Sequence, residues 1–248
     1  MKKSSIYLII LGLSLALLSG CQTKAADTPP TLTKADQALV WQAEREKPFG
    51  YYDYKELADE KELTTLLTDK FELSLPKSYQ TFQTLVSQTA YFQGMEKQGQ
   101  AYEIISSGEQ VIVHTQTQYG TAEQVDVTAD LTLTYKFSAE EKQAYLYQQT
   151  IVLNDGTADQ MSQFYDSLEE ICTTVAKPLG FGEVEGAVQT FKNKHAGADK
   201  ALVKQTLSIT DNTAEMKKEK GLQKSIQVYY DTDGVLRTVF IDLIDLTK

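Results

Sequence analysis

The sequence predicts an α+β fold: an antiparallel sheet of about seven strands with helices packed on one face. The clearest observation is the segment 124–137, where seven apolar residues from Val125 to Phe137 alternate with six polar ones. Strict alternation is typical of a strand with one face on a core and one face in water, as in antiparallel sheets. A second observation is that helical and strand patterns come in separate runs, which is typical of α+β folds.

The N-terminal half of the domain shows helical patterns first and strand patterns afterwards. Helices are expected over 33–47, over 51–67 and around 79–86. The alternating segment 71–75 predicts at most a short strand, because Pro76 follows it. Four strands are expected after residue 100, at 101–105, 110–119, 124–137 and 142–153. A hairpin turn at 106–109 joins the first two of these strands.

The C-terminal half repeats this order. The breaker 154–156 precedes Thr157 and Gln160, which form a capping-box pattern. The helix expected there has an apolar face made of Met161, Phe164, Leu168, Cys172 and Val175. A second helix at 183–195 and strands at 202–210, 224–230 and 235–244 follow, with a hairpin turn at 230–234. Two α-then-β halves dividing near residue 155, or one continuous sheet, fit this order equally well.

The N-terminus carries a targeting signal. Lys2 and Lys3 precede an apolar run from Ile6 to Leu18, which is too short to span a bilayer as a permanent helix. The run ends in Leu18-Ser19-Gly20-Cys21, which resembles the lipobox of bacterial lipoproteins. The resemblance implies that residues 1–20 are a signal peptide, that Cys21 is diacylated, and that the protein is anchored to the outer face of the cell membrane.

The rest of the chain then divides into a tether and a domain. Residues 21–32 are polar and contain Pro29-Pro30, which predicts a flexible tether. At ~3.3 Å per residue the tether reaches at most ~40 Å, so the domain, residues 33–248, stays close to the membrane. A subdivision near residue 155 would split this α+β domain in two.

Charge and cysteine usage limit the possible partners. Loss of residues 1–20, with two lysines and no acidic residue, takes the net charge from −10 to −12. Such an acidic surface disfavours nucleic acid and anionic lipid, so the membrane is reached through the lipid on Cys21. Cys172 is then the remaining cysteine, which excludes an internal disulfide and favours a Gram-positive surface. In a Gram-negative cell, Gln22 would resemble the outer-membrane sorting pattern.

Candidate catalytic residues are few. His114 falls on the polar register of its strand, and His195 lies at a helix end, where a cation is favourable. Neither belongs to a metal-binding or nucleophile motif. Cys172 lies on the apolar face of its helix, so a buried small side chain explains it better than a nucleophile.

Other motifs have structural explanations. Gly180, Gly182 and Gly186 follow a helix rather than a strand, so they predict a turn and not a nucleotide loop. Asp231-Thr232-Asp233-Gly234 lacks the later ligands of a calcium loop and predicts a hairpin turn. The acidic pairs Glu169/Glu170 and Asp242/Asp245 are interpreted as solvated charge, and so is a basic connection. That connection contains Lys217, Lys218, Lys220 and Lys224.

These observations favour a non-enzymatic, lipid-anchored binding module whose ligand is a protein, a peptide or a cell-wall component. No catalytic residue, cofactor site or metal site is predicted. One alternative is an envelope hydrolase that uses carboxylates from distant parts of the chain. Another is a solute receptor, although the β–α alternation typical of such receptors is missing. A third is that residues 13–20, which resemble the octapeptides of Gram-positive mating pheromones, are released as a signal.

Overall fold

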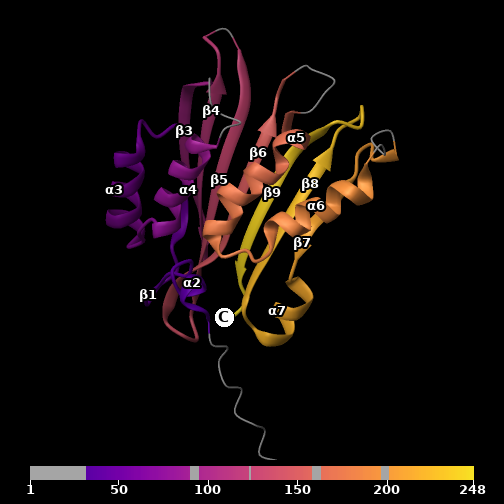
Figure 1. The fold of residues 1–248 in the computed structure, drawn as a ribbon. Coiled ribbons are helices and arrows are strands. Elements are labelled where there is room, and N and C mark those ends of the chain that lie inside the picture. The colour runs from indigo at the N-terminus through magenta and orange to yellow at the C-terminus, as the bar shows by residue number, and fades with distance from the viewer. Residues whose placement is uncertain (1–31, 90–94, 123, 158–162, 197–200) are drawn as a thin grey trace, which may run out of the picture. The chain divides into compact units, whose positions relative to one another are not determined.

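The computed structural model describes residues 32–89, 95–122, 124–157, 163–196 and 201–248 (Figure 1). Thr31–Lys248 forms one compact unit. Its helical segments are α2 (Lys34–Gln37), α3 (Glu60–Phe71), α4 (Lys77–Gln88), α5 (Gln163–Ile171), α6 (Val184–His195) and α7 (Thr213–Glu219). Its strands are β1 (Gln42–Glu44), β2 (Gly50–Tyr54), β3 (Glu96–Gly108), β4 (Gln110–Gly120), β5 (Val125–Ser138), β6 (Gln143–Asp155), β7 (Thr206–Asp211), β8 (Leu222–Tyr230) and β9 (Leu236–Asp245).

All nine strands belong to one sheet, which confirms the predicted α+β class with an antiparallel sheet. The order is β2-β3-β4-β5-β6-β9-β8-β7, and β1 pairs in addition with β6. Every ladder is antiparallel. The two α-then-β runs of the sequence meet at the ladder between β6 and β9, so their strands form one continuous sheet.

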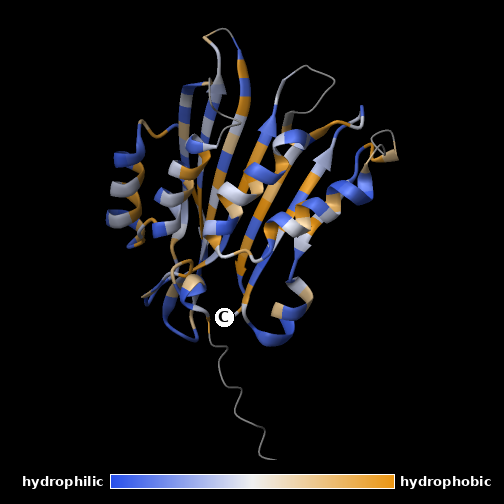
Figure 2. Cartoon of the chain, in the orientation of Figure 1, coloured by the Kyte–Doolittle hydropathy of each residue, from blue (hydrophilic) through white to orange (hydrophobic). Residues whose placement is uncertain are grey.

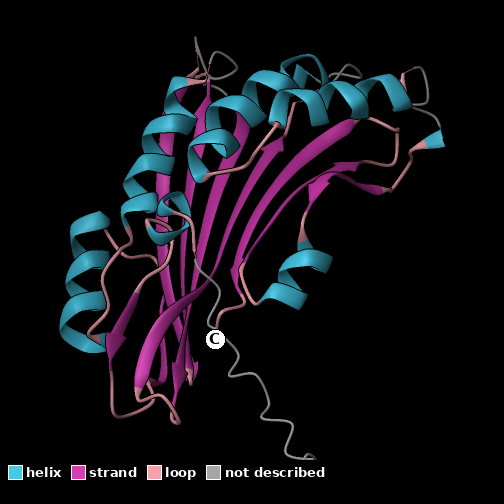
Figure 3. Ribbon diagram, turned by 60° about the horizontal axis from the view of Figure 1, so that its bottom comes forward, coloured by secondary structure: helices cyan, strands magenta, loops and turns pink. Residues whose placement is uncertain are grey.

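The helices lie on one side of this sheet. Figure 3 shows α3, α4, α5 and α6 gathered over one face, with the sheet arching beneath them. Strand β5 explains the asymmetry: Leu131 and Leu133 point to the helices and are at most 2% exposed, while Thr132 points to the other side. Figure 2 shows the same alternation of hydrophobic and hydrophilic residues along the central strands. Burial of the inward-facing apolar side chains of the sheet against the helices holds the sheet and the helix layer together.

The long helical segment after β6 behaves as its apolar pattern predicts. Phe164, Leu168, Cys172 and Val175 are completely buried. The helix widens into a π-helix at Cys172–Ala176, tightens into a 3-10 turn at Lys177–Leu179, and ends at Gly180, whose φ is 75°. Glycine adopts this left-handed conformation without steric cost, which allows the sharp turn towards α6. Met161 and Gln160 lie outside the described residues, and the hydroxyl of Thr157, the other member of the expected capping box, donates a hydrogen bond to Oδ1 of Asp155 at 2.6 Å.

The first forty described residues differ from the sequence-based expectation. In place of a helix over 33–47, α2 has a single turn and is followed by β1. The segment 51–54 is not helical either, because it pairs with β3 as strand β2. Tyrosine side chains pack well against the side chains of a neighbouring strand, so pairing with β3 overrides the weak helical periodicity of this segment. The segment 72–76 forms no strand.

Helix α3 begins later than expected, at a capping box. The Asp59 side chain accepts a hydrogen bond from the backbone N–H of Glu62 at 2.8 Å. The Glu62 carboxylate accepts one from the N–H of Ala58 at 2.7 Å. Two donors at the helix end are thereby satisfied, which fixes where α3 starts.

The basic connection is only partly solvated. Residues 213–219 form helix α7, which the sequence analysis did not predict, and Lys217 and Lys218 are exposed. Lys224 instead lies in β8 and is only 9% exposed. Its Nζ is 2.6 Å from a carboxylate oxygen of Asp36 and donates a hydrogen bond to the carbonyl of Gly180 at 2.8 Å. The interpretation of Lys224 as solvated charge is therefore wrong.

Candidate functional site

The side of the sheet away from the helices is the candidate site, and we call it the open face. Its side chains come from alternate positions of every central strand and are half-buried by their neighbours. Strand register places them in rows across the sheet. One row contains Glu103, His114, Thr132, Thr150 and Asp242. The next contains Ala101, Gln116, Asp130, Val152 and Phe240.

Asp130 is the centre of one hydrogen-bond network on the open face. Its Oδ1 lies 3.0 Å from Nε2 of His114 and accepts a hydrogen bond from Nε2 of Gln116 at 2.8 Å. The hydroxyl of Thr128 donates to Oδ2 at 3.4 Å. The Asp130 side chain is only 13% exposed, so its negative charge is partly withdrawn from water and interacts more strongly with neighbouring groups.

The two ionisable groups of this network perturb each other. The hydrogen bond to Asp130 raises the pKa of His114, although partial burial opposes it. Burial would raise the pKa of Asp130, but the hydrogen bonds from His114 and Gln116 outweigh it and lower that pKa. Both shifts favour a charged imidazolium–carboxylate pair.

Asp242 is the centre of a second network, across β6. The hydroxyl of Thr150 donates to its Oδ1 at 2.6 Å, and Nε2 of Gln148 donates to the same oxygen at 3.3 Å. Register puts the Cα atoms of Asp130 and Asp242 two strands and two residues apart, roughly 12 Å. The side chain of Asp130 bonds towards β4 and that of Asp242 towards β6, so the two carboxylates belong to separate networks.

Apolar exposure concentrates where the open face meets strand β2. The described residues include five exposed large hydrophobic side chains, and three of them, Tyr51, Tyr52 and Ile105, lie on β2 and β3. We call these three residues the tyrosine edge. Tyr51 is 82% exposed and pairs with Ser107 on the open face. Tyr51 and Ile105 lie near each other on the open face, whereas Tyr52 points to the helix side of the same edge. Exposed apolar residues that lie together mark interaction surfaces more often than isolated ones do.

Tyr52 is packed against the helix side, whereas Tyr51 lies largely in solvent beside the β3–β4 turn. The Tyr51 ring lies near the β3–β4 turn, where a Cβ added at Gly108 would come within 3.2 Å of the Tyr51 hydroxyl. Tyr52 points to the helix side, with its ring centroid 5.9 Å from that of Phe71 and the amine of Lys70 4.0 Å above it. An aromatic ring that is already oriented loses little entropy on binding.

The residues that the sequence analysis singled out are dispersed. His114 lies on the open face as its register predicts, whereas His195 ends α6 against the ring of Phe191 at 4.8 Å. Cys172 is completely buried, and desolvation raises its pKa to about 12, so its thiol is not a ready nucleophile. Asp242 and Asp245 point to opposite sides of β9, and Asp245 is only 5% exposed.

The turn at 231–234 is a hairpin turn, as predicted. The Asp231 carboxylate accepts hydrogen bonds from the N–H groups of Asp233 and Val235 at 2.8 and 2.9 Å, and Nε of Arg237 donates to it at 2.8 Å. These donors use the oxygens that a cation would need. Within the described ranges, no three His, Cys, Asp or Glu side chains are grouped closely enough to hold a metal ion.

Sequence reasoning missed the tyrosine edge and the two carboxylate networks. Tyr51 and Tyr52 fell in a segment expected to be helical. The networks join side chains that are close only when the strand register is known. Polar period-two positions in 110–119 and 125–137 were the visible signal for one side of the open face.

Comparison of the chain with protein-family models, curated protein sequences and solved structures finds no match. No helix among the described residues is long and apolar enough to cross a membrane.

Proposed function

We propose that this protein is a lipid-anchored, extracytoplasmic binding module that holds a protein partner on the open face of its sheet. The observation that carries the proposal is the tyrosine edge adjoining a large polar sheet face that none of the described helices covers. The anchor rests on the lipobox-like Leu18-Ser19-Gly20-Cys21.

The open face has the size of an ordinary protein interface. Eight strands spaced ~4.8 Å apart and ~30 Å long give a face of ~1,000 Å². A standard interface takes about 800 Å² from each partner. A single small ligand would leave most of this face unused, whereas a folded partner matches its extent.

The chemistry of the face also fits a protein partner. Interfaces combine a small apolar or aromatic centre with a polar rim, and tyrosine is enriched among the residues that carry the binding energy. Tyr51 and Ile105 supply an exposed apolar anchor at the β2 edge of the face, and the networks around Asp130 and Asp242 supply ordered polar groups towards its middle. The acidic groups of the face, Glu103 included, favour a partner with a basic surface.

The arrangement of the acidic groups supports the proposal of binding without catalysis. Among the described residues, Asp130 and Asp242 share no hydrogen-bond partner, and each is held by neutral or cationic donors from its own network. Turnover of a wall or peptide substrate that one substitution abolishes would overturn the proposal.

Site-directed crosslinking in living cells tests the proposal. Ile105 is replaced by the photo-crosslinking amino acid p-benzoylphenylalanine, and Glu169 on the helix side is replaced in the same way as a matched control. We expect one protein to crosslink from position 105, not from 169, and only while Cys21 is intact. Equal crosslinking from both positions, or none from 105, would refute the open face as the binding surface.

The purified crosslinked partner then gives a quantitative test. Tyr51→Ala should weaken its binding about ten-fold, because a tyrosine that anchors an interface carries ~1.4 kcal/mol or more of binding energy. Thermal stability should stay unchanged, since Tyr51 is 82% exposed. Tyr51→Phe, which keeps the ring, is the matched control.

A further inference from the structure

A second candidate site lies at the opposite edge of the sheet, between α6 and β7. Within the described residues β7 is the last strand of the sheet and pairs on one side, with β8. Between it and α6 runs a groove of about 500 Å³. The groove lies on the helix side, so it is separate from the open face.

The strand wall of the groove carries an irregularity. Ser208, Ile209 and Thr210 all line the groove, although successive side chains of a regular strand point to opposite faces. The reason is a register shift between Ser208 and Thr210, which leaves Ile209 without a pairing partner on β8. Bulges of this kind occur at sheet edges and redirect a side chain. Here the bulge brings both backbone and side chain to the groove.

The helix wall carries small residues near its N-terminal end and larger ones towards its C-terminal end. Gly182, just before α6, and Gly186, Ala187 and Thr190 of α6 line the first part, and Phe191, Lys194 and His195 line the rest. A Cβ added at Gly182 or at Gly186 would meet nothing within 4 Å, so packing inside the domain does not require glycine at either position. Glycine near the start of a helix lowers its stability relative to alanine. These two glycines leave the groove wide enough for another backbone to approach.

The ends of the groove carry opposite charges. Glu183 lies at one end, and Lys194 and His195 lie at the other. Within the part of the chain that the structure describes, neither Glu183 nor Lys194 forms an ion pair. The Lys194 end therefore offers a cation that is available to an incoming acidic group.

We infer that the α6–β7 groove binds an extended peptide segment of another protein, which adds to β7 as a further strand and places an acidic side chain beside Lys194. Main-chain hydrogen bonds to an edge strand supply affinity, and alternate side chains in a groove supply specificity. The six residues of β7 match a peptide of about six residues, ~20 Å in length. The charge at each end sets the direction in which the peptide lies.

A display library of random heptapeptides is the probe, selected on the full chain. The affinities of the selected peptides are then measured for three variants. Gly186→Phe places a ring in the groove, and its Cβ meets nothing within 4 Å. Lys194→Glu reverses the charge at one end. Gln189→Phe adds the same ring to the same helix outside the groove and is the matched control.

We expect acidic peptides whose affinity falls at least ten-fold with Gly186→Phe and with Lys194→Glu and stays within two-fold with Gln189→Phe. Amide exchange of Thr206–Asp211 should slow on binding. Each backbone nitrogen of a selected peptide is methylated in turn. Methylation should abolish binding at every second nitrogen and be tolerated at the ones between, because only alternate N–H groups of an added strand face β7. Circular dichroism of each variant confirms that the fold is kept.

Three results would overturn the inference. The first is a set of selected peptides that bind wild type and Gly186→Phe equally. The second is slowed exchange at the tyrosine edge in place of Thr206–Asp211. The third is a homodimer in sedimentation that Gly186→Phe dissociates, because the occupant would then be a second copy of this chain and not a peptide.

Discussion

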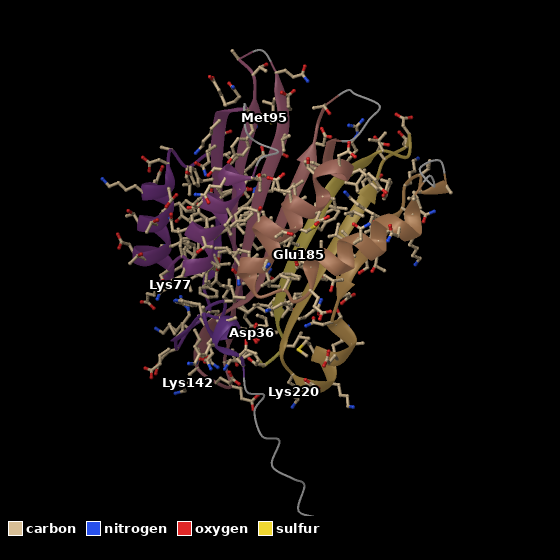
Figure 4. The ribbon with its side chains drawn as sticks, viewed as in Figure 1. Asp36, Lys77, Met95, Lys142, Glu185 and Lys220 are labelled. Atoms are coloured by element: carbon tan, nitrogen blue, oxygen red, sulfur yellow. The ribbon has the colours of Figure 1, made fainter. Side chains whose placement is uncertain are left out.

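Replacing Lys224 by methionine should detach the first helix of the domain and lower stability substantially. Lys224 and Asp36 are 11% and 15% exposed as side chains, with nitrogen and oxygen 2.6 Å apart. Burial would raise the pKa of Asp36, but hydrogen bonds from Lys224 and Thr33 hold it below its ordinary value. The pair is therefore charged and largely withdrawn from water. Asp36, labelled in Figure 4, lies at the end of the domain where the C-terminus lies in Figure 1.

The expected loss follows from the partners that remain. Removing one member of a fully buried ion pair costs about 3–5 kcal/mol, because the other charge is left unpaired. Here the hydroxyl of Thr33 still donates to Asp36 at 2.7 Å and some water reaches the carboxylate, so we expect about 2–3 kcal/mol. For a domain of this size that lowers Tm by about 4–12 °C. The Gly180 carbonyl also loses its hydrogen bond from Lys224.

Urea denaturation with a double-mutant cycle measures this coupling. The free energies of unfolding of Lys224→Met, Asp36→Asn and the double variant are compared. The stability losses of the two single variants should add up to about 1–2 kcal/mol more than the loss of the double variant. Lys218→Met, on the exposed side of α7, is the matched control and should stay within ~0.5 kcal/mol of wild type. If Lys224→Met is no more harmful than Lys218→Met, the ion pair does not hold α2 to the sheet.

Three further predictions follow from the sheet. Leu133→Asp should unfold the domain by placing a charge in the core, whereas Thr132→Asp, one residue away on the open face, should change stability little, and thermal denaturation of both checks the strand register. The stability lost in Asp130→Asn should be largest below about pH 6.5 and should shrink as the pH rises through the raised pKa of His114, because only the imidazolium gains from the pair. On the acid side the loss should shrink again as the pH falls through the lowered pKa of Asp130, and NMR titration of His114 in wild type and variant tests the sign. Cys172 should react with a maleimide only after denaturation, since the native thiol is buried and its pKa is raised to about 12.

Much of the fold could be read from local patterns. The alternation in 125–137 fixed which face of β5 is buried, because period two is a property of neighbouring residues. The helical stripe through Leu168 and Cys172 likewise fixed their burial, and the turns at 106–109 and 231–234 were visible as breakers. Each of these features depends on residues that lie close together in the sequence.

The candidate site was less accessible, because its members meet only through pairing across the sheet. Gln116 and Asp130 lie on different strands, and nothing in either strand specifies that they stand opposite each other. The 51–54 segment became a strand because β3 offered it an edge, which its own periodicity could not show.

The sequence by itself determined the class of the domain and the inward face of its central strands. The tertiary structure decided which strands form the edges of the sheet, where Tyr51 stands exposed, and that Lys224 is buried against Asp36. The physical reason is range. Periodicity and turn chemistry act between neighbours in the chain, whereas an ion pair, a sheet edge or a groove exists only once distant segments have packed together.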